Sequence, residues 1–477
     1  MTTPRAATEP VLPTMNLDGS RRWLRPALTP GRFWQARRIV AYTLMVVFFL
    51  IPYLQLNGKP LVLLDIPRRE FTIGGYTFLP TDTLLFMLLF VSVAIAIFLL
   101  TALFGRIWCG WGCPQTVYME FLFRPLERLI EGRPGAATAG RRVTLARRAL
   151  KYAVYLVLAL FLAHTFLAYF VGIERLAQWI RLSPLEHPTA FFVMALTTGA
   201  IFFDFTWFRE QTCLVACPYG RLQSVLLDRK SMIVAYQPLR GEPRARGRER
   251  TGAGDCIDCG ACVRTCPTGI DIRDGLQMEC IHCTQCMDAC DGIMDRVGKP
   301  RGLIKYSSRS EVEGHPAGLL RPRVVLYPAA LLVAVSLLGY FLSTKRDTDV
   351  TLLRGIGAPY SFDAGGQVVN NIRIKLTNRA GAERRYLITL DEDEDDVRLL
   401  APENPLPVAA GAGRTEGVFV MAPPDAFEDG RRSISFRISD GERYSESFEY
   451  LLVGPRRGEH PERDEERRGS DRRGEKP

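Results

Sequence analysis

Apolar residues along the chain gather in five long runs. A helix needs roughly 20 apolar residues to cross the hydrocarbon core of a bilayer, and these runs approach or reach that length. The fourth run is the shortest and ends at Asp204, so a buried soluble helix is the alternative interpretation for it. We predict five membrane-spanning helices, at about Ile39–Leu56, Thr83–Phe104, Tyr152–Ile173, Pro188–Phe203 and Val324–Leu342.

Basic residues are distributed unevenly around these runs. Because short basic loops stay on the cytoplasmic side of a membrane, we predict a cytoplasmic N-terminus, cytoplasmic loops 105–151 and 204–323, and a periplasmic C-terminus. The first run lacks a small-residue cleavage site and is expected to remain as an anchor in the bacterial inner membrane. The basic segments hold Arg21, Arg22, Arg25, Arg32, Arg37 and Arg38 before the first run, and Arg106, Arg124, Arg128, Arg133, Arg141, Arg142, Arg147 and Arg148 after the second. The opposite loops hold only Lys59, Arg68, Arg69, Arg175 and Arg181.

The pattern changes after the fifth run, at residues 347–455. Short alternating segments are separated there by Gly, Pro, Asp and Asn turns, which is typical of an all-β immunoglobulin-like sandwich. This region contains no cysteine, and its sequence does not separate a docking surface for a partner from a folded cap without chemistry. The clearest predicted strands are Val368–Leu376, Arg385–Leu390, Gly417–Met421 and Ser433–Ile438.

The twelve cysteines fall into two patterned sets, and the first is a pair of runs. Each run has the spacing Cys-x2-Cys-x2-Cys-x3-Cys of bacterial ferredoxins, in which the fourth cysteine ligates the other [4Fe-4S] cluster. Zinc knuckles use paired units of two ligands, and disulfides are rare in a reducing cytoplasm. One departure is that Asp291, not proline, follows the last cysteine. We predict Cys256, Cys259, Cys262 and Cys290 on one cluster, and Cys280, Cys283, Cys286 and Cys266 on the second.

The second set consists of two Cys-x3-Cys-Pro motifs, which we call the first hook (Cys109–Pro114) and the second hook (Cys213–Pro218). Each follows an apolar run, and similar residues flank both, which predicts an internal repeat with the four thiols near a pseudo-twofold axis. In a helical turn, thiols at i and i+4 share one face, and thiolates select Cu(I), zinc or iron–sulfur centres. The alternative is that these cysteines only pack.

The order of these features resembles the cytochrome c oxidase accessory protein CcoG family, also called FixG or RdxA. The features are, in order, paired hooks after membrane helices, a two-cluster ferredoxin insert, a last span and a periplasmic β-domain. The resemblance covers roughly residues 35–455. It implies reduction of Cu(II) to Cu(I) during assembly of the copper site of cbb(3)-type cytochrome oxidase. It also implies that the eight ferredoxin cysteines deliver electrons to a copper or redox site formed by Cys109, Cys113, Cys213 and Cys217.

Two other functions stay open. Membrane quinol dehydrogenases of the NapH type also combine four helices, paired hooks and a two-cluster segment, although the fifth span and the C-terminal domain favour the oxidase-assembly protein. A non-catalytic assembly scaffold is the third reading. Of the five histidines, only His164 lies in a predicted span, and no haem-attachment motif occurs. His282, inside the second cysteine run, is expected to face solvent or to tune the cluster by a hydrogen bond.

These observations give a domain plan for the chain. It comprises a cytoplasmic N-terminal segment (1–38), a four-helix membrane region with the hooks (39–229), a solvated basic linker (230–255), a ferredoxin domain (256–322), a fifth span (323–343), the periplasmic β-domain (344–455) and a disordered charged tail (456–477).

Charge and composition bear mainly on partners. The formal net charge is +10, but the arginines crowd beside apolar spans and lack interleaved aromatic residues, so nucleic acid is not expected. The expected partners are the lipid bilayer, a cytoplasmic electron donor, and oxidase assembly factors with copper chaperones. The sequence leaves a homodimer open.

Overall fold

A computed structural model describes the chain as two compact units. One unit contains Met1–Leu56 and Pro60–Phe341, and the other contains Asn57–Lys59 and Leu342–Pro477. The structure describes residues 13–16, 18–56, 58–67, 69–78, 82–132, 143–246, 252–315, 321–344, 348–380, 382–391, 396–442 and 444–456. The predicted tail from 457 onward, part of the basic linker (247–251), and Arg68, Arg133, Arg141 and Arg142 of the charge pattern lie outside these residues.

Five long apolar helices are present in the first unit. They are α1 (Arg32–Leu50), α2 (Thr83–Phe104), α6 (Leu145–Val171), α8 (Pro188–Phe203) and α14 (Pro322–Ser343). A π-helical turn, η4 (Asp204–Phe208), lengthens the fourth apolar stretch to 21 residues, so the fourth span is long enough to cross a bilayer. At most 39% of any span is buried within the protein, and apolar surface of this extent is suited to lipid.

The first span differs from its predicted bounds at both ends. Helix α1 begins at Arg32, before the apolar run, because its first turns pack on α12 (Gln285–Arg296) of the ferredoxin domain. The helix ends at Leu50, followed by a short 3-10 turn, η1 (Ile51–Tyr53), where Pro52 supplies no backbone N–H. The predicted end at Leu56 was therefore wrong.

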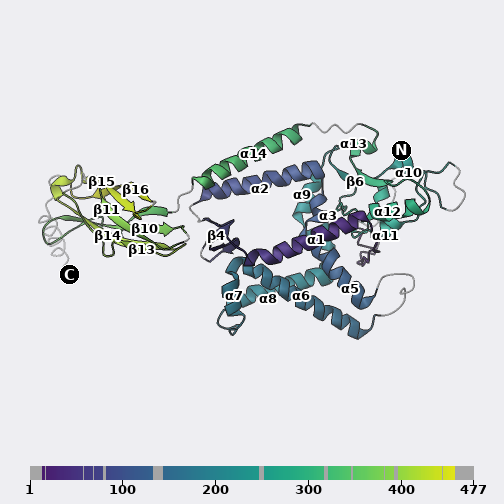
Figure 1. Ribbon diagram of the computed structural model, residues 1–477, viewed down its shortest axis with the longest axis horizontal. Helices are drawn as coiled ribbons and strands as arrows, with labels where there is room; N and C mark the ends of the chain where they lie inside the picture. Colours follow the sequence, from purple (N-terminus) through teal and green to yellow (C-terminus); the bar gives the residue numbers. More distant parts are fainter. Residues whose placement is uncertain are drawn as a thin grey trace, which may run out of the picture. The chain divides into compact units, whose positions relative to one another are not determined.

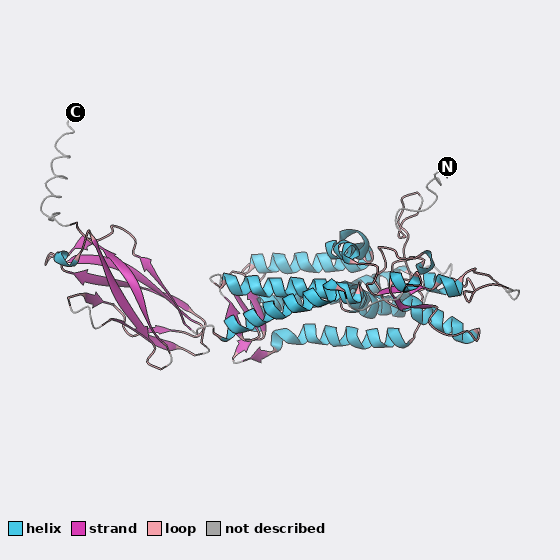
Figure 2. Cartoon of the chain, turned by 90° about the horizontal axis from the view of Figure 1, so that it is seen from above, coloured by secondary structure: helices cyan, strands magenta, loops and turns pink. Residues whose placement is uncertain are grey.

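Short β-strands fill the connection between α1 and α2. A hairpin, β1 (Gln55–Leu56) and β2 (Lys59–Pro60), precedes the antiparallel sheet β3–β4–β5 (Val62–Asp65, Glu70–Ile73, Tyr76–Phe78). Within this unit, Figures 1 and 2 show the spans running lengthwise, with β4 at one end and the hook and ferredoxin elements at the other. Helix α7 (Ile173–Trp179) follows α6 at the β4 end.

Short helices at the opposite end of the spans carry the hooks. The first hook spans α3 (Ile107–Trp111) and the start of α4 (Pro114–Tyr118), which continues through a π-helical turn, η2 (Met119–Phe123), into α5 (Arg124–Glu131). The second hook comprises another π-helical turn, η5 (Thr212–Ala216), and the start of α9 (Pro218–Leu226).

The ferredoxin domain is closed by two strands far apart in the sequence. Strand β6 (Ile233–Tyr236) pairs antiparallel with β7 (Ile304–Ser307). All four residues of β6 are buried, so the prediction of a solvated linker at 230–255 was wrong for this segment, whose apolar side chains pack with Met294 and Leu303. Between the strands lie α10 (Pro238–Gly241), α11 (Ala261–Arg264), η6 (Ile272–Asp274) and α12, and α13 (Arg309–Val312) follows β7.

The second unit is the predicted β-sandwich. One sheet has the order β12–β14–β10–β8 with β9 beside β10, and the other has the order β13–β11–β15–β16. Alternate residues such as Ile372, Ile374, Ile434 and Phe436 are buried between the sheets, which is the pattern of two packed antiparallel layers. The strands are β8 (Thr348–Arg354), β9 (Ser361–Phe362), β10 (Val368–Asn378), β11 (Arg384–Leu390), β12 (Arg398–Leu400), β13 (Leu406–Val408), β14 (Gly413–Ala422), β15 (Arg431–Ser439) and β16 (Ser445–Val453), with a 3-10 turn, η7, at Pro424–Ala426.

Candidate metal centre

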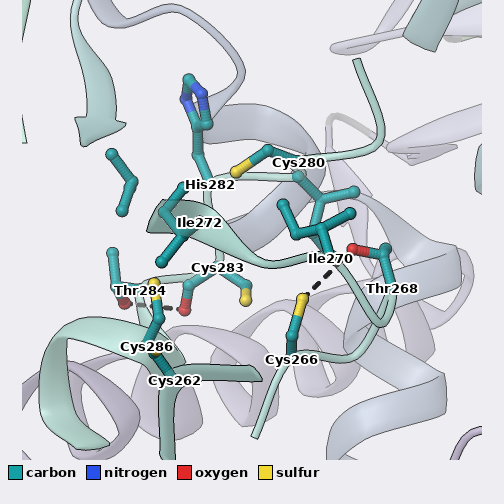
Figure 3. A pocket seen from close by; sticks show the side chains of 12 residues that line it. Cys262, Cys266, Thr268, Ile270, Ile272, Cys280, His282, Cys283, Thr284 and Cys286 are labelled. Atoms are coloured by element: carbon teal, nitrogen blue, oxygen red, sulfur yellow. Dashed lines mark hydrogen bonds between the residues drawn. The ribbon is translucent and has the colours of Figure 1, made fainter. Parts of the chain in front are cut away.

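Four cysteines from both runs surround one cavity in the ferredoxin domain. Figure 3 shows Cys266, Cys280, Cys283 and Cys286 around this cavity. Cys266 follows α11, whereas the other three come from the loop before α12 and from its first turn. Cys262 also reaches the wall of the cavity. This is the grouping that the crossover pattern predicts for the second cluster, and ligation itself stays a prediction.

The remaining cysteine of the second run lies with the first run. Burial, together with the charges of the nearby groups Cys262, Asp291, Cys256 and Cys259, raises the pKa of Cys290 to about 12. The first set of predicted ligands is therefore together in space. Asp291, which replaces the expected proline, accepts a hydrogen bond from the backbone N–H of Gly302 at 2.9 Å, so it anchors the end of the ferredoxin domain.

The two cysteine runs share an unusual backbone conformation. Asp258 and Gly260 have positive φ in the first run, and His282 and Thr284 have positive φ at the same positions of the second. Left-handed residues that alternate with right-handed ones form concave backbone segments, which suit anionic groups such as iron–sulfur centres. In the second run, this backbone brings Cys280, Cys283 and Cys286 to the same cavity.

The burial of these thiols makes a cation necessary if they are to be thiolates. Burial raises the pKa of Cys280 to about 12 and that of Cys283 to about 11. Thiolate is the form that ligates metal, so bound metal would supply the stabilising charge. Among the residues that the structure describes, no three His, Cys, Asp or Glu side chains converge closely enough to hold one metal ion. The cysteines instead surround a cavity, and this arrangement fits a multi-atom centre better than a single zinc.

The spacing predicted that the two cysteines of each hook share one face of a helix, and this prediction was wrong. Cys113 and Cys217 are extended residues, with ψ of 125° and 109°, at the N-caps of α4 and α9. A residue that precedes proline is disfavoured in the helical region, and Pro114 and Pro218 follow these two cysteines. Each hook is therefore a break between two short helices.

The predicted internal repeat is visible in the backbone of the hooks. Gly105 and Arg209 end the preceding helical segments with φ of 58° and 53°, and each precedes the first cysteine of its hook by the same interval. The hook thiols lie close to one another. Burial raises the pKa of Cys213 to about 12, with further contributions from Cys113, Cys109 and Cys217.

The first hook is packed directly on the ferredoxin domain. Cys109 shares one apolar cluster with Ile281 and Cys283, to which Tyr219 of α9 also contributes. A Cβ atom on Gly110 would lie 2.6 Å from the carbonyl oxygen of Ile281, so the backbones nearly touch. The hook thiol Cys109 is thus next to a predicted ligand of the second cluster.

His282 lies at this same contact and is 1% exposed, so the expectation that it faces solvent was wrong. Its Nδ1 accepts a hydrogen bond from the backbone N–H of Arg106 at 3.1 Å, because the start of the first hook covers the cysteine loop. Burial, with help from the positive charge of Arg106, lowers the pKa of His282 to about 3. The histidine is therefore neutral at physiological pH.

A buried ion-pair network beside the hooks was not found from the sequence. Arg209 Nη2 lies 2.9 Å from Glu127 Oε2, and Arg124 pairs with Glu120 and, at 3.5 Å, with Glu210. The basic and acidic residues of 124–128 had been interpreted only as repeat and charge signals. Their partner Arg209 is distant in sequence, so spacing alone could not reveal the pairs.

This network borders both the second hook and the ferredoxin domain. Gln285 of α12 donates from Nε2 to Glu120 Oε2 at 3.1 Å. Glu120, Cys213 and Thr268 line a cavity of about 300 Å³. The ion-pair network is therefore joined by a hydrogen bond to α12 of the ferredoxin domain.

Comparison with known proteins agrees with this arrangement. Residues 208–309 match the family model of a 4Fe-4S dicluster domain, residues 85–134 match a 4Fe-4S binding domain, and residues 338–455 match the Ig-like fold at the C-terminus of FixG. Protein RdxA of Cereibacter sphaeroides is 35% identical over 387 residues, which are 77% of this chain and 81% of that protein. The chain belongs to the FixG/RdxA family.

Two further members of the FixG/RdxA family show the extent of the similarity. Protein RdxB of Cereibacter sphaeroides is 32% identical, and the aligned region covers 87% of this chain and 92% of RdxB. The nitrogen fixation protein FixG of Rhizobium meliloti is 30% identical and covers 78% of this chain and 79% of its own. The chain is thus an iron–sulfur electron-transfer protein of the membrane with two [4Fe-4S] clusters.

Proposed function

We propose that this FixG/RdxA protein is a cupric reductase that serves the assembly of cbb(3)-type cytochrome c oxidase. The observation that carries the proposal is the packing of Cys109 against Ile281 and Cys283. It joins the gathered hook thiols to a predicted ligand of the second cluster. Soft thiolates stabilise Cu(I) over harder metal ions, so the hooks suit the product of the reaction.

The proposed reaction transfers one electron. Cu(II) accepts it at the hook thiols and leaves as Cu(I), with no bond formed or broken in the polypeptide, and a soluble one-electron donor replaces the electron. When bound by the eight ferredoxin cysteines in the crossed arrangement, the two clusters supply single electrons. The chain's own part is to hold the thiols of Cys109 and Cys213 close together, with Cys109 buried and Cys213 half-buried.

We propose that the hook end of the spans faces the cytoplasm. Arginines before α1 and between α2 and α6 support this orientation, in which the donor reaches the ferredoxin domain from the cytoplasm. The Ig-like domain then faces the periplasm, where it would meet oxidase assembly factors or copper chaperones.

The test of cupric reductase activity is the combined substitution Cys109→Ala and Cys213→Ala. The anaerobically purified protein is reduced, freed of reductant and mixed with Cu(II), and Cu(I) is measured with a coloured chelator. We expect loss of Cu(I) formation with unchanged iron–sulfur absorbance, because neither cysteine is a predicted cluster ligand. A matched Cys109→Ser and Cys213→Ser variant preserves size and polarity but not softness. Wild-type rates in either variant would reject the proposal.

Oxidation of a membrane quinol is the second candidate, and one cavity favours it. A cavity of about 200 Å³ lies between α6, α7 and α8, with mainly apolar walls and two imidazoles, those of His164 and His187. This lining suits a small aromatic ligand. The Leu160 carbonyl accepts from His164 Nδ1 at 2.8 Å, so Nε2 is left as an acceptor for a hydroxyl group. His187 stacks on Trp179 with ring centroids 4.6 Å apart.

Quinol oxidation would release two electrons and two protons, with the iron–sulfur centres as electron acceptors. Its test is anaerobic addition of a short-chain quinol to the oxidised protein while the iron–sulfur absorbance is followed. Bleaching in the wild type that is lost in His164→Ala would favour this function. Absence of bleaching in the wild type would exclude it and leave copper reduction as the candidate.

A further inference from the structure

Arg37 is a buried arginine in the first turns of α1, where the helix meets the hook end of the unit. Its side chain is 1% exposed. Nε donates to the carbonyl oxygen of Gly110 at 2.9 Å, between the two cysteines of the first hook. Nη1 and Nη2 are buried without a hydrogen-bond partner among the residues that the structure describes. A buried guanidinium is costly unless a negative group compensates it.

Two negative groups are candidates for this compensation. Glu120 lies near Arg37, but it already pairs with Arg124 and accepts from Gln285. The other is the predicted second cluster. Gly110, whose carbonyl oxygen accepts from Arg37 Nε, lies against the backbone carbonyl groups of Ile281 and His282, next to Cys283. Because Glu120 has its own partners, this cluster is the negative group that would compensate the two unpaired Nη atoms of Arg37.

We propose that Arg37 is the counter-charge of the second cluster, and that it sets how readily this cluster is reduced. This inference rests on the ligand assignment proposed above for Cys266, Cys280, Cys283 and Cys286. Four thiolates around an iron–sulfur core leave a net negative charge, which grows by one unit on reduction. A fixed positive charge in a buried site therefore stabilises the reduced state more than the oxidised one. Arg37 is a positioning residue, since it acts through the cluster and not on copper.

The test is the midpoint potential of each cluster in the full-length protein, measured by redox titration with EPR detection. In Arg37→Gln, the equilibrium constant for reduction should fall at least about tenfold in one of the two titration steps. For one electron, this is a decrease in midpoint potential of about 59 mV. The other step should stay at its wild-type value. Iron and sulfide contents should stay unchanged, which separates an effect on potential from loss of the cluster.

Two further variants distinguish charge from structure. Arg37→Lys keeps the charge and should keep the potential, whereas an equal decrease in both variants would overturn the proposal. Arg38→Gln is the matched control, because Arg38 stacks on Trp34 and donates to Gln35 on its own helix. An unchanged potential in a fully loaded Arg37→Gln protein would also overturn it.

If Arg37→Gln does not assemble its clusters, a second variant with the opposite expected shift in midpoint potential tests the proposal. Glu120 places a negative charge near Cys283, so Glu120→Gln should raise the same midpoint potential. An unchanged or lowered value would overturn the proposal. Iron-free wild-type protein would instead contradict the ligand assignment, and loss of copper reduction in the hook variants is independent of both results.

Discussion

Gly110 lies where the first hook meets the ferredoxin domain, and its lack of a side chain permits that contact. A Cβ atom there would lie 2.6 Å from the Ile281 carbonyl oxygen and 2.7 Å from that of His282. Both obstacles are backbone atoms, which cannot rotate away as a flexible side chain can. The contact between hook thiol and cluster loop therefore depends on glycine at this position.

We predict that Gly110→Ala separates the hook from the ferredoxin domain. Overpacking of this kind typically costs about 1–3 kcal/mol. We expect a lower thermal unfolding midpoint and slower Cu(I) formation, with unchanged iron content. Gly199→Ala is the matched control, because nothing lies within 4 Å of a Cβ atom there. Equal rates in the two variants would show that this contact does not limit electron transfer.

Single residues divide into those that spacing reveals and those that only the fold reveals. The cysteines were predictable because both cysteine runs place their thiols by local backbone turns. The burial of Arg37 and His282 was not, since each is covered by segments distant in sequence. In the same way, His187 had no visible link to His164 until the packing of α6 beside α8 placed both on one cavity.

At the scale of elements, the ion pair between Arg209 and Glu127 fixes α5 against the start of the second hook. We predict that Glu127→Gln, which removes the nearer of the two carboxylates that pair with the buried Arg209, destabilises the protein by about 3 kcal/mol. Thermal unfolding in detergent would measure this change. Glu313→Gln is the control, because Glu313 pairs at 2.8 Å with Arg229, whose side chain is 70% exposed, and such pairs contribute little.

Acid should remove the advantage of Glu127. Burial alone would raise the pKa of Glu127, but the charge and hydrogen bonds of Arg209 lower it below the ordinary value. A carboxylate with a lowered pKa stabilises the folded state above its unfolded pKa of about 4.3, and this contribution is lost as the pH falls through the folded value. The difference in unfolding midpoint between wild type and Glu127→Gln should thus be constant from pH 6 to 8 and smaller in acid. A constant difference down to low pH would contradict this account.

Elements were predictable where hydrophobic period and length agree, and their ends were not. All five apolar runs are helices, and the alternation along Val368–Asn378 and Arg431–Ser439 gives strands of the sandwich. The start of α1 and strand β6 were missed because polar or short segments became ordered by packing on the ferredoxin domain. The hook conformation was missed because the effect of proline on the preceding cysteine outweighed helical spacing.

At the scale of the whole molecule, two independent observations concern orientation. The packing of α1, both hooks and the ferredoxin domain keeps the N-terminal end of α1 and the cysteines together. In the proposed topology, in which all five apolar helices cross the bilayer, the odd number of spans assigns the C-terminal domain to the opposite side. The basic flanks of α1 and α2 favour the cytoplasm for the side that holds the cysteines.

We predict that a reporter fused after His315 is cytoplasmic and that one fused after Arg456 is periplasmic. Alkaline phosphatase folds into its active form only outside the cytoplasm, so it should be active after Arg456 and inactive after His315. A green fluorescent reporter exported by the same route should give the opposite pattern, which controls for expression. The reversed pattern would place the clusters in an oxidising compartment and remove any cytoplasmic donor from reach. Activity of the phosphatase at both positions would mean that one of the five apolar helices does not cross the bilayer. Helix α14 would be examined first, because only 6% of its apolar stretch is buried within the protein.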